Sequence, residues 1–157
     1  MRRYLVAANQ TLQAAELREE LRKRISAGPC SFFVIVPGTE AAQYDPVAAG
    51  GVLPQPGMWW WATYYARPAT DEEAIAQARE RLRLMLAGLA ALGVPVEGDL
   101  GSSSPLEAME EACADRQFDE IIVATLPRHL SRWLRADLPH RAERRFRLPL
   151  TTIITRR

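Results

Sequence analysis

The sequence predicts an α/β fold: a three-layer α/β/α sandwich around a five-stranded parallel sheet in the order 3-2-1-4-5. Two observations predict it. Short apolar runs, typical of strands buried on both faces, alternate along the chain with longer segments whose apolar residues recur every three or four positions. Right-handed crossovers then make the doubly wound order the simplest arrangement. The 157 residues, 48% of them hydrophobic, fit a single globular domain over residues 1–157.

The N-terminal part of the chain contains two predicted strands with a helix between them. Residues 4–8 and 31–36 are the apolar runs that indicate the strands. Thr11 is a candidate cap for the helix, and Gly28 with the proline after it ends that helix. The apolar stripe of the helix consists of Ala14, Leu17, Leu21 and Ile25.

Residues 38–69 form a long irregular insertion that is rich in proline and contains Gly50, Gly51 and the run Trp59–Trp61. Irregular segments of this length inside a compact domain are usually functional. At least one ring of an extended tryptophan run would face solvent unless something covered it. We therefore expect the run to cover the mouth of a crevice or a subunit interface, with contact to a bound aromatic ligand as the alternative.

A long helix is predicted to follow the insertion. Thr70 and Glu73 stand three positions apart, as in a capping box, and Gly93 ends the helix after about Leu92. Its apolar stripe consists of Ile75, Ala78, Leu82, Met85, Leu89 and Leu92. A short third strand is expected within residues 94–99.

The next helix is predicted from a second capping box, Ser104 with Glu107, and from Pro105 at the first helical position. Its inner face consists of Leu106, Met109 and Cys113.

Two further strands and a helix complete the predicted fold. Residues 121–124 are an apolar run of the buried parallel kind, and residues 151–154 form the last strand. The helix between them begins near Leu130 and is interrupted near Pro139.

Charge is distributed unevenly along the chain. Residues 1–115 contain 10 basic and 15 acidic side chains, whereas residues 116–157 contain 10 basic side chains, all arginine, and 4 acidic ones. The C-terminal part therefore favours an anion-facing surface. Nucleic acid is not expected as a partner, because the net charge is only +1 and no reading motif is present.

The remaining composition narrows the class of protein. No apolar run approaches the length of about 20 residues that a membrane helix needs, and no signal-peptide pattern is present, so a cytoplasmic location is expected. Cys30 and Cys113 lie far apart and are expected to be buried, reduced thiols. No metal-ligand spacing occurs, so no metal site is expected.

The candidate binding site follows from the predicted strand order. Ligands of such sheets bind at the carboxyl ends of the strands where the order reverses, here between the first and fourth strands. Arginines near the start of the helix that follows the fourth strand favour a phosphate or carboxylate there, although a solvated basic face is the alternative. The candidate ligand-binding residues are Asn9, Thr11, Thr125, Arg128, His129, Ser131 and Arg132.

The C-terminal half of the chain resembles the universal stress protein family. Gly98-Asp99, followed by the segment 105–108, resembles the family's Gly-Asp-Pro stretch, and the segment 148–151 resembles its Cys-Pro-Val motif before the last strand. The resemblance implies a Rossmann-like fold of the adenine nucleotide alpha hydrolase-like kind and a role in stress response. It also implies a homodimer formed through the last strand, Thr151–Thr155.

The glycines of the family's ATP-binding motif are replaced in this chain. Leu126, His129 and Pro139 occupy the three glycine positions, and His140 stands in the place of the Ser or Thr that follows the last of them. Asn9 occupies the place of the family's nucleotide-binding aspartate. Glycines there let backbone N–H groups reach phosphate oxygens. The chain therefore resembles a divergent branch without the motif, in which ATP is not bound in the usual manner and no cofactor is expected.

Three functions remain open from the sequence. The first is a binding or regulatory module that works without a nucleotide. The second is a phosphate or altered-nucleotide binder that uses the crevice side chains. The third, disfavoured, is a hydrolase or transferase. His129 has no visible nucleophile or second acid or base beside it, so no catalytic residue is assigned.

Overall fold

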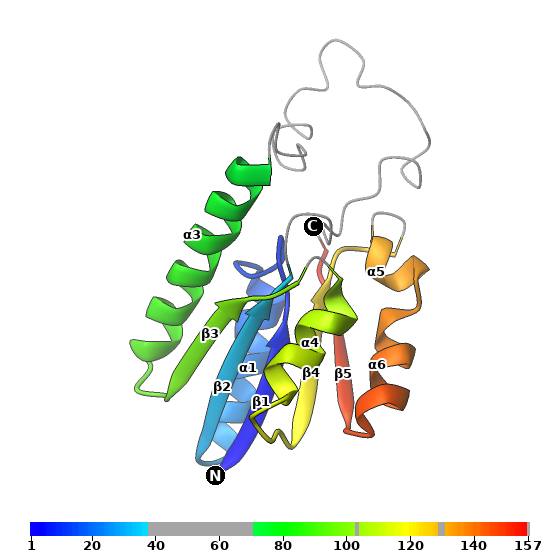
Figure 1. Ribbon diagram of the computed structural model, residues 1–157. Coiled ribbons are helices and arrows are strands. Elements are labelled where there is room, and N and C mark those ends of the chain that lie inside the picture. Colours follow the sequence, from blue (N-terminus) through cyan, green and yellow to red (C-terminus); the bar gives the residue numbers. More distant parts are fainter. Residues whose placement is uncertain (38–70, 103, 129–130, 157) are drawn as a thin grey trace.

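The computed structural model describes residues 1–37, 71–102, 104–128 and 131–156. The predicted sheet is confirmed: five parallel strands lie in the order β3-β2-β1-β4-β5 (Figure 1). The strands are β1 (Arg2–Ala7), β2 (Cys30–Val36), β3 (Val96–Leu100), β4 (Glu120–Thr125) and β5 (Leu150–Ile154). The insertion at 38–69, with its tryptophan run, lies outside the described residues.

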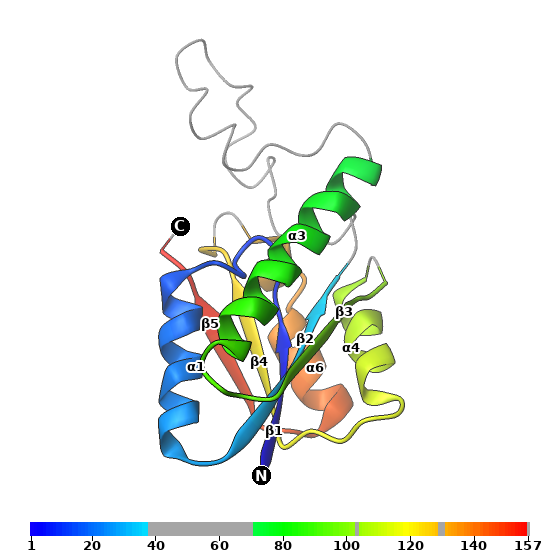
Figure 2. The same ribbon diagram turned by 90° about the vertical axis from the view of Figure 1, so that its left-hand side faces the viewer.

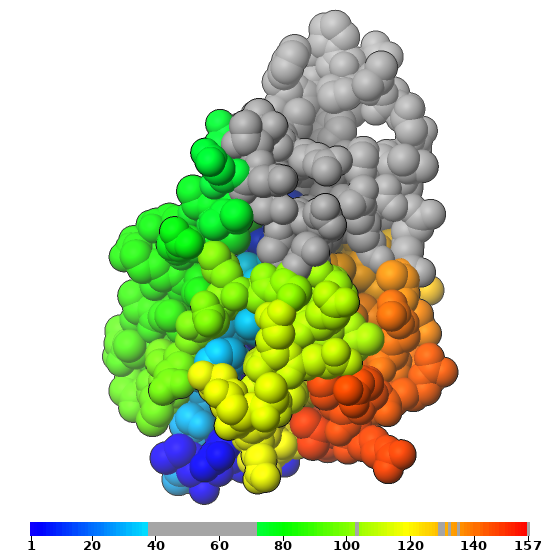
Figure 3. All heavy atoms as spheres, viewed as in Figure 1, coloured from blue at the N-terminus to red at the C-terminus, as the bar shows by residue number. Residues whose placement is uncertain are grey.

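Helices cover both faces of the sheet, which gives the predicted three layers. One face carries α1 (Ala15–Ala27) and α3 (Asp71–Ala90) (Figure 2). The other carries α4 (Pro105–Cys113), α5 (Arg132–Arg135) and α6 (Leu138–Phe146). Figure 3 shows α4 and α6 side by side over this second face.

Two apolar clusters fill the space between the sheet and its helices. Successive residues of a strand point to opposite faces, so Tyr4 and Val6 of β1 join the cluster under α1 and α3, while Leu5 joins the one under α4 and α6. Trp133 of α5 is buried in the second cluster. The strands are apolar on both faces because both faces are covered.

The predicted strands and helices are largely confirmed, with corrections at the helix starts. Thr11 does not cap α1, which begins at Ala15 with Ala14 as its cap residue and no side-chain cap bond. Ser104 likewise makes no side-chain cap bond, so the second capping box is wrong even though α4 does begin at Pro105. The first predicted box contains Thr70, which lies outside the described residues.

The predicted stripe of α3 is correct in its middle and wrong at its ends. Four of its members are buried: Ala78, Leu82, Met85 and Leu89. Ile75 and Leu92 are 39% and 47% exposed. Gly93, with φ +78°, ends the helical segment as expected.

The helix after β4 is interrupted as predicted, but slightly before Pro139. The break falls at residues 136 and 137, where Asp137 adopts a left-handed backbone with φ 54°, and Pro139 lies in the first turn of α6. Proline is well tolerated in a first turn because the N–H it lacks has no helical partner there.

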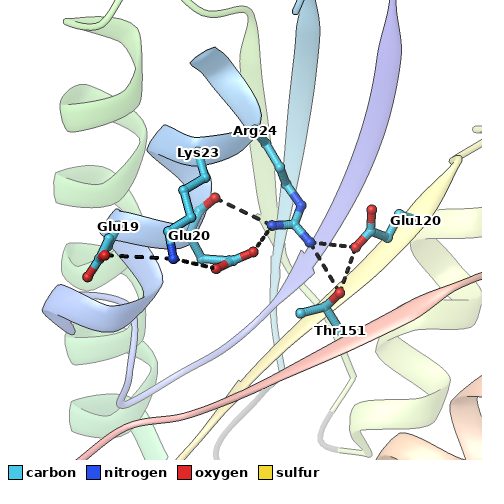
Figure 4. Close-up of polar contacts among 6 residues, drawn as sticks. All are labelled: Glu19, Glu20, Lys23, Arg24, Glu120 and Thr151. Atoms are coloured by element: carbon cyan, nitrogen blue, oxygen red, sulfur yellow. Dashed lines mark hydrogen bonds and ion pairs between the residues drawn. The ribbon is translucent and has the colours of Figure 1, made fainter. Parts of the chain in front are cut away.

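A partly buried polar network fastens α1 to the amino ends of β4 and β5 (Figure 4). Arg24 donates from Nη2 to Glu120 Oε1 at 2.5 Å and to Thr151 Oγ1 at 3.1 Å, and it also pairs with Glu20. The Thr151 hydroxyl donates to the same Glu120 oxygen at 2.7 Å. The Arg24 guanidinium lies 5.4 Å from the centre of the Tyr4 ring. One arginine therefore joins α1, β1, β4 and β5.

Candidate functional site

The candidate site lies at the carboxyl ends of the strands, where β1 and β4 are neighbours and the strand order reverses. Ligands of doubly wound sheets bind at this place. The loop after β1 and the loop after β4 meet here, and they contain the residues that the sequence nominated.

Thr11 joins these two loops. Its side chain is 2% exposed, and its hydroxyl donates to the carbonyl oxygen of Ala124 at 2.8 Å. A hydroxyl has a single proton, so this bond uses its only donor. Thr11 therefore holds the loop after β1 against β4.

Thr125 and Ser131 lie together beneath the loop after β4, and both are fully buried. The Thr125 hydroxyl donates to the Leu126 carbonyl at 2.7 Å and lies 3.2 Å from Ser131 Oγ. Ser131 Oγ accepts the backbone N–H of Leu134 at 3.1 Å. Ser131 thereby caps the start of α5, and both side chains stabilise the loop.

Of the three basic side chains nominated in this region, the structure describes that of Arg128. Arg128 is exposed at the turn after β4. His129 lies outside the described residues. Arg132 is the first residue of α5, and its side chain also lies outside the description. An anion held jointly by these three side chains remains a prediction.

Asn9 contacts a charged residue that the sequence reasoning missed. Asn9 is 4% exposed, and its Nδ2 donates to the carbonyl oxygen of Pro37 at 3.1 Å. Its Oδ1 accepts a hydrogen bond of 2.9 Å from Nη2 of Arg81, which lies on α3. Asn9 therefore connects the end of β2, the loop after β1 and the middle of α3.

Arg81 carries a charge that no acidic side chain in the described ranges balances. Its guanidinium makes no ion pair with a described carboxylate, and its Nε is buried without a hydrogen-bond partner. Burial lowers the pKa of Arg81 below its ordinary value. Arginine nevertheless stays protonated in proteins, so a positive charge persists beside the carboxyl end of β1.

Other unsatisfied polar atoms lie in the same region. Among the described residues, the buried side-chain atoms without a partner are Gln10 Oε1, Arg24 Nε, Arg81 Nε and Thr155 Oγ1. Gln10 belongs to the loop after β1, and Thr155, just after β5, donates its backbone N–H to the Thr125 carbonyl. Buried polar groups nearly always have a partner, so these three atoms of residues near the carboxyl ends of the strands are groups that solvent or a ligand can satisfy.

One signal in the sequence could have identified Arg81. It stands three residues after Ala78 and four before Met85, both of which are buried on the inner side of α3. A charged residue at such a position interrupts an apolar stripe. Charged side chains are seldom buried unless they are paired.

The loop after β4 is filled by a side chain where the resembled motif has its first glycine. Leu126 is 2% exposed. Pro127, which follows it, has no N–H to offer a phosphate. This loop therefore lacks two features of a backbone phosphate cradle.

The described ranges contain neither a cluster of metal ligands nor a candidate membrane helix. No group of three or more His, Cys, Asp or Glu side chains lies close enough there to hold a metal ion. No helix in those ranges is long and apolar enough to span a bilayer.

Cys30 and Cys113 are free thiols, as expected, although Cys113 is only partly buried. Burial raises the pKa of both thiols. A raised pKa leaves less of the reactive thiolate at neutral pH.

Comparison with known proteins supports the fold. No protein-family model matches the chain, and no curated protein sequence matches it. A universal stress protein family protein from Arabidopsis thaliana, solved with AMP bound, matches it in structure with a TM-score of 0.58 and 13% sequence identity. The match covers 99% of this chain and 92% of that one. The chain therefore has a universal-stress-protein-like fold.

Proposed function

We propose that the protein is a universal-stress-protein-like binding or regulatory module whose ligand is a small anion, such as a phosphate or the phosphate of an altered nucleotide. The observation that carries the proposal is the Arg81 guanidinium, which is largely buried, contacts Asn9 and has no acidic partner among the described residues. An anion would supply the missing countercharge through charge-assisted hydrogen bonds.

The arrangement around Arg81 favours binding because it is already ordered. Asn9 Oδ1 can accept from Arg81 Nη2 only in one orientation of the amide, and the bond from Asn9 Nδ2 to the Pro37 carbonyl holds that orientation. A preordered donor loses little side-chain entropy when its ligand binds. Exposed Arg128 adds positive charge at the end of β4.

In this proposal the side chains replace the glycine-rich backbone by which the resembled family holds ATP. Buried Leu126, at the place of the first glycine, and Pro127, which has no N–H, support this part of the proposal. The similar Arabidopsis protein was solved with AMP, which makes AMP a suitable probe next to inorganic phosphate and ATP.

Ligand-induced changes in melting temperature test the proposal. Inorganic phosphate, AMP and ATP are added separately to the wild type, to Arg81→Met and to the control Arg83→Met. Arg83 lies on the same helix, is 63% exposed and pairs with Glu80. We expect at least one of the three anions to raise the melting temperature of the wild type and the control but not of Arg81→Met. No shift with any anion would refute the proposal.

The same assay on Arg128→Ala/Arg132→Ala tests the residues nominated from the sequence. A shift that survives in Arg81→Met but disappears in this double variant would overturn the role of Arg81 and move the anion to the loop after β4. Because each variant is compared with itself without ligand, a change in its basal stability does not affect the interpretation.

We further propose that the module forms a homodimer through β5. The strand is at the edge of the sheet, and Ile154 is 51% exposed on it. An exposed edge strand can pair with the same strand of a second molecule. A lysine side chain on that strand opposes such pairing. Light scattering should give the mass of a dimer for the wild type and of a monomer for Ile154→Lys. A monomeric wild type at high concentration contradicts this proposal.

A further inference from the structure

A groove is lined by residues of α1 and of the α3 segment, with Gln13 before α1. Figure 2 shows these two helices on the same face of the sheet. The groove has a volume of about 300 Å³. Its floor contains Met85 and Leu89, whose other sides pack in the core, and its rim contains Leu84 and Leu92, which are 44% and 47% exposed. Apolar side chains that gather at a concave surface and remain exposed mark interaction sites more often than scattered ones do.

Gly88 lines the groove from the last turn of α3 and leaves it open. A Cβ atom at this position would have no heavy atom within 4 Å, apart from the helix's own backbone and its chain neighbours. Glycine destabilises a helix interior relative to alanine. A glycine in this place lets the backbone of another helix approach α3 closely.

Two arginines of α1 form the opposite wall. Arg18 and Arg22 are exposed and lie one helical turn apart. Neither has an ion pair with a described residue, unlike Lys23 and Arg24 on the same helix, which pair with Glu20. The described residues that line the groove include no Asp or Glu. The groove therefore combines an apolar floor with an unbalanced positive wall.

We propose that this groove binds an amphipathic helix of a partner protein, with apolar side chains against Leu84, Gly88 and Leu92 and carboxylates against Arg18 and Arg22. The walls of the groove come from two helices, and the side-chain ridges of a third helix can pack into such a groove. Carboxylates complement the two unpaired guanidinium groups. The inference concerns a surface separate from the anion site and does not depend on the proposed function.

Fluorescence anisotropy with synthetic peptides tests the proposal. The probe is a labelled helical peptide of about 18 residues, with leucines at i, i+3, i+4 and i+7 and glutamates beside them. A second peptide has lysine in place of every glutamate, and a third has alanine in place of every leucine. We expect saturable binding of the glutamate peptide, weakened by salt, and no saturable binding of the other two.

Two variants of the protein locate the contact. Arg18→Gln/Arg22→Gln should weaken binding of the glutamate peptide roughly tenfold, as the loss of two partly exposed ion pairs would. The control Arg141→Gln/Arg144→Gln makes the same change of charge on exposed residues of α6, across the sheet, and should bind like the wild type. Gly88→Leu places a side chain in open space and should abolish binding without unfolding the protein.

Three outcomes would overturn the proposal. The first is equal binding of the glutamate and lysine peptides. The second is a loss of affinity in the α6 control as large as that in the α1 variant. The third is binding to vesicles of anionic phospholipid, with none to the glutamate peptide, which would assign the groove to a membrane surface instead.

Discussion

Arg24 and Glu120, 96 positions apart in the chain, form an ion pair of 2.5 Å that joins α1 to the first residue of β4. Their side chains are only 12% and 13% exposed. The Glu120 oxygen that accepts from Arg24 also accepts from Thr151 of β5. This carboxylate therefore lies where three elements of the fold meet.

We expect Glu120→Gln to lower the free energy of unfolding by about 2 kcal/mol, because it leaves the guanidinium of Arg24 partly buried beside a neutral group. The matched control is Glu19→Gln, which removes an exposed partner of Lys23 on the same helix and should cost less than about 0.5 kcal/mol. Urea unfolding measures both. Equal effects would show that the burial of the Arg24 pair is unimportant.

The pKa of Glu20 makes stability depend on pH. The hydrogen bond from Arg24, with smaller help from the charges of Arg24 and Lys23, lowers the pKa of Glu20 below its ordinary value of 4.5. A lowered folded-state pKa adds stability that is fully present above the unfolded-state value and is lost as the pH falls through the folded-state value. We expect urea unfolding to show that the wild type loses stability as the pH falls through the acid range. Glu20→Gln should lose less stability over the same range. An unchanged pH dependence in Glu20→Gln would contradict the prediction.

The hydroxyl of Thr11 is expected to matter for stability and not for the ligand. Thr11→Val keeps the shape of the side chain but leaves the Ala124 carbonyl without this donor, which should cost about 1–3 kcal/mol. Phosphate, AMP and ATP should shift its melting temperature as they shift that of the wild type. A ligand shift that disappears while the unfolding free energy stays at the wild-type value would make Thr11 a ligand contact.

Two glycines should respond to alanine in opposite ways. At Gly98 of β3, a Cβ atom would lie 2.8 Å from Leu82 Cδ1 and 2.8 Å from the Val34 carbonyl oxygen. Gly98→Ala must therefore displace backbone and should cost about 1–3 kcal/mol. Gly88→Ala meets nothing and should gain about 0.5–1 kcal/mol as a better helix former. Thermal and urea unfolding measure the stability of both variants. An unchanged unfolding free energy in Gly98→Ala would disprove the prediction.

The strands and their order were predictable because burial on both faces leaves apolar runs such as 31–36, and because alternation with helices restricts the topology. The helix starts were harder to predict. Thr11 has the residue type of a cap, yet its hydroxyl bonds to Ala124, 113 positions away. A bond over that distance depends on tertiary structure, which local spacing does not encode.

The position of the nominated residues in the fold was predictable, whereas a ligand site there stays a prediction. Asn9, Thr11, Thr125 and Ser131 lie near the carboxyl ends of β1 and β4, where the strand order reverses. What Asn9 and Thr11 do there could not be read from the sequence, because Asn9 bonds to Pro37 and Arg81, and Thr11 to Ala124, all distant in the chain. Arg81 was missed because α3 was treated as an apolar stripe alone.

The ends of the described chain lie at opposite ends of the sheet (Figure 1). Exposed Met1 precedes the amino end of β1, while Arg156 follows β5 and donates its backbone N–H to Glu16 of α1 at 3.0 Å. An affinity tag or fluorophore fused before Met1 would therefore point away from Arg81 and Arg128. A protein immobilised by that end would present the proposed anion site to the solution, whereas attachment at the end that follows β5 would bring the support close to it.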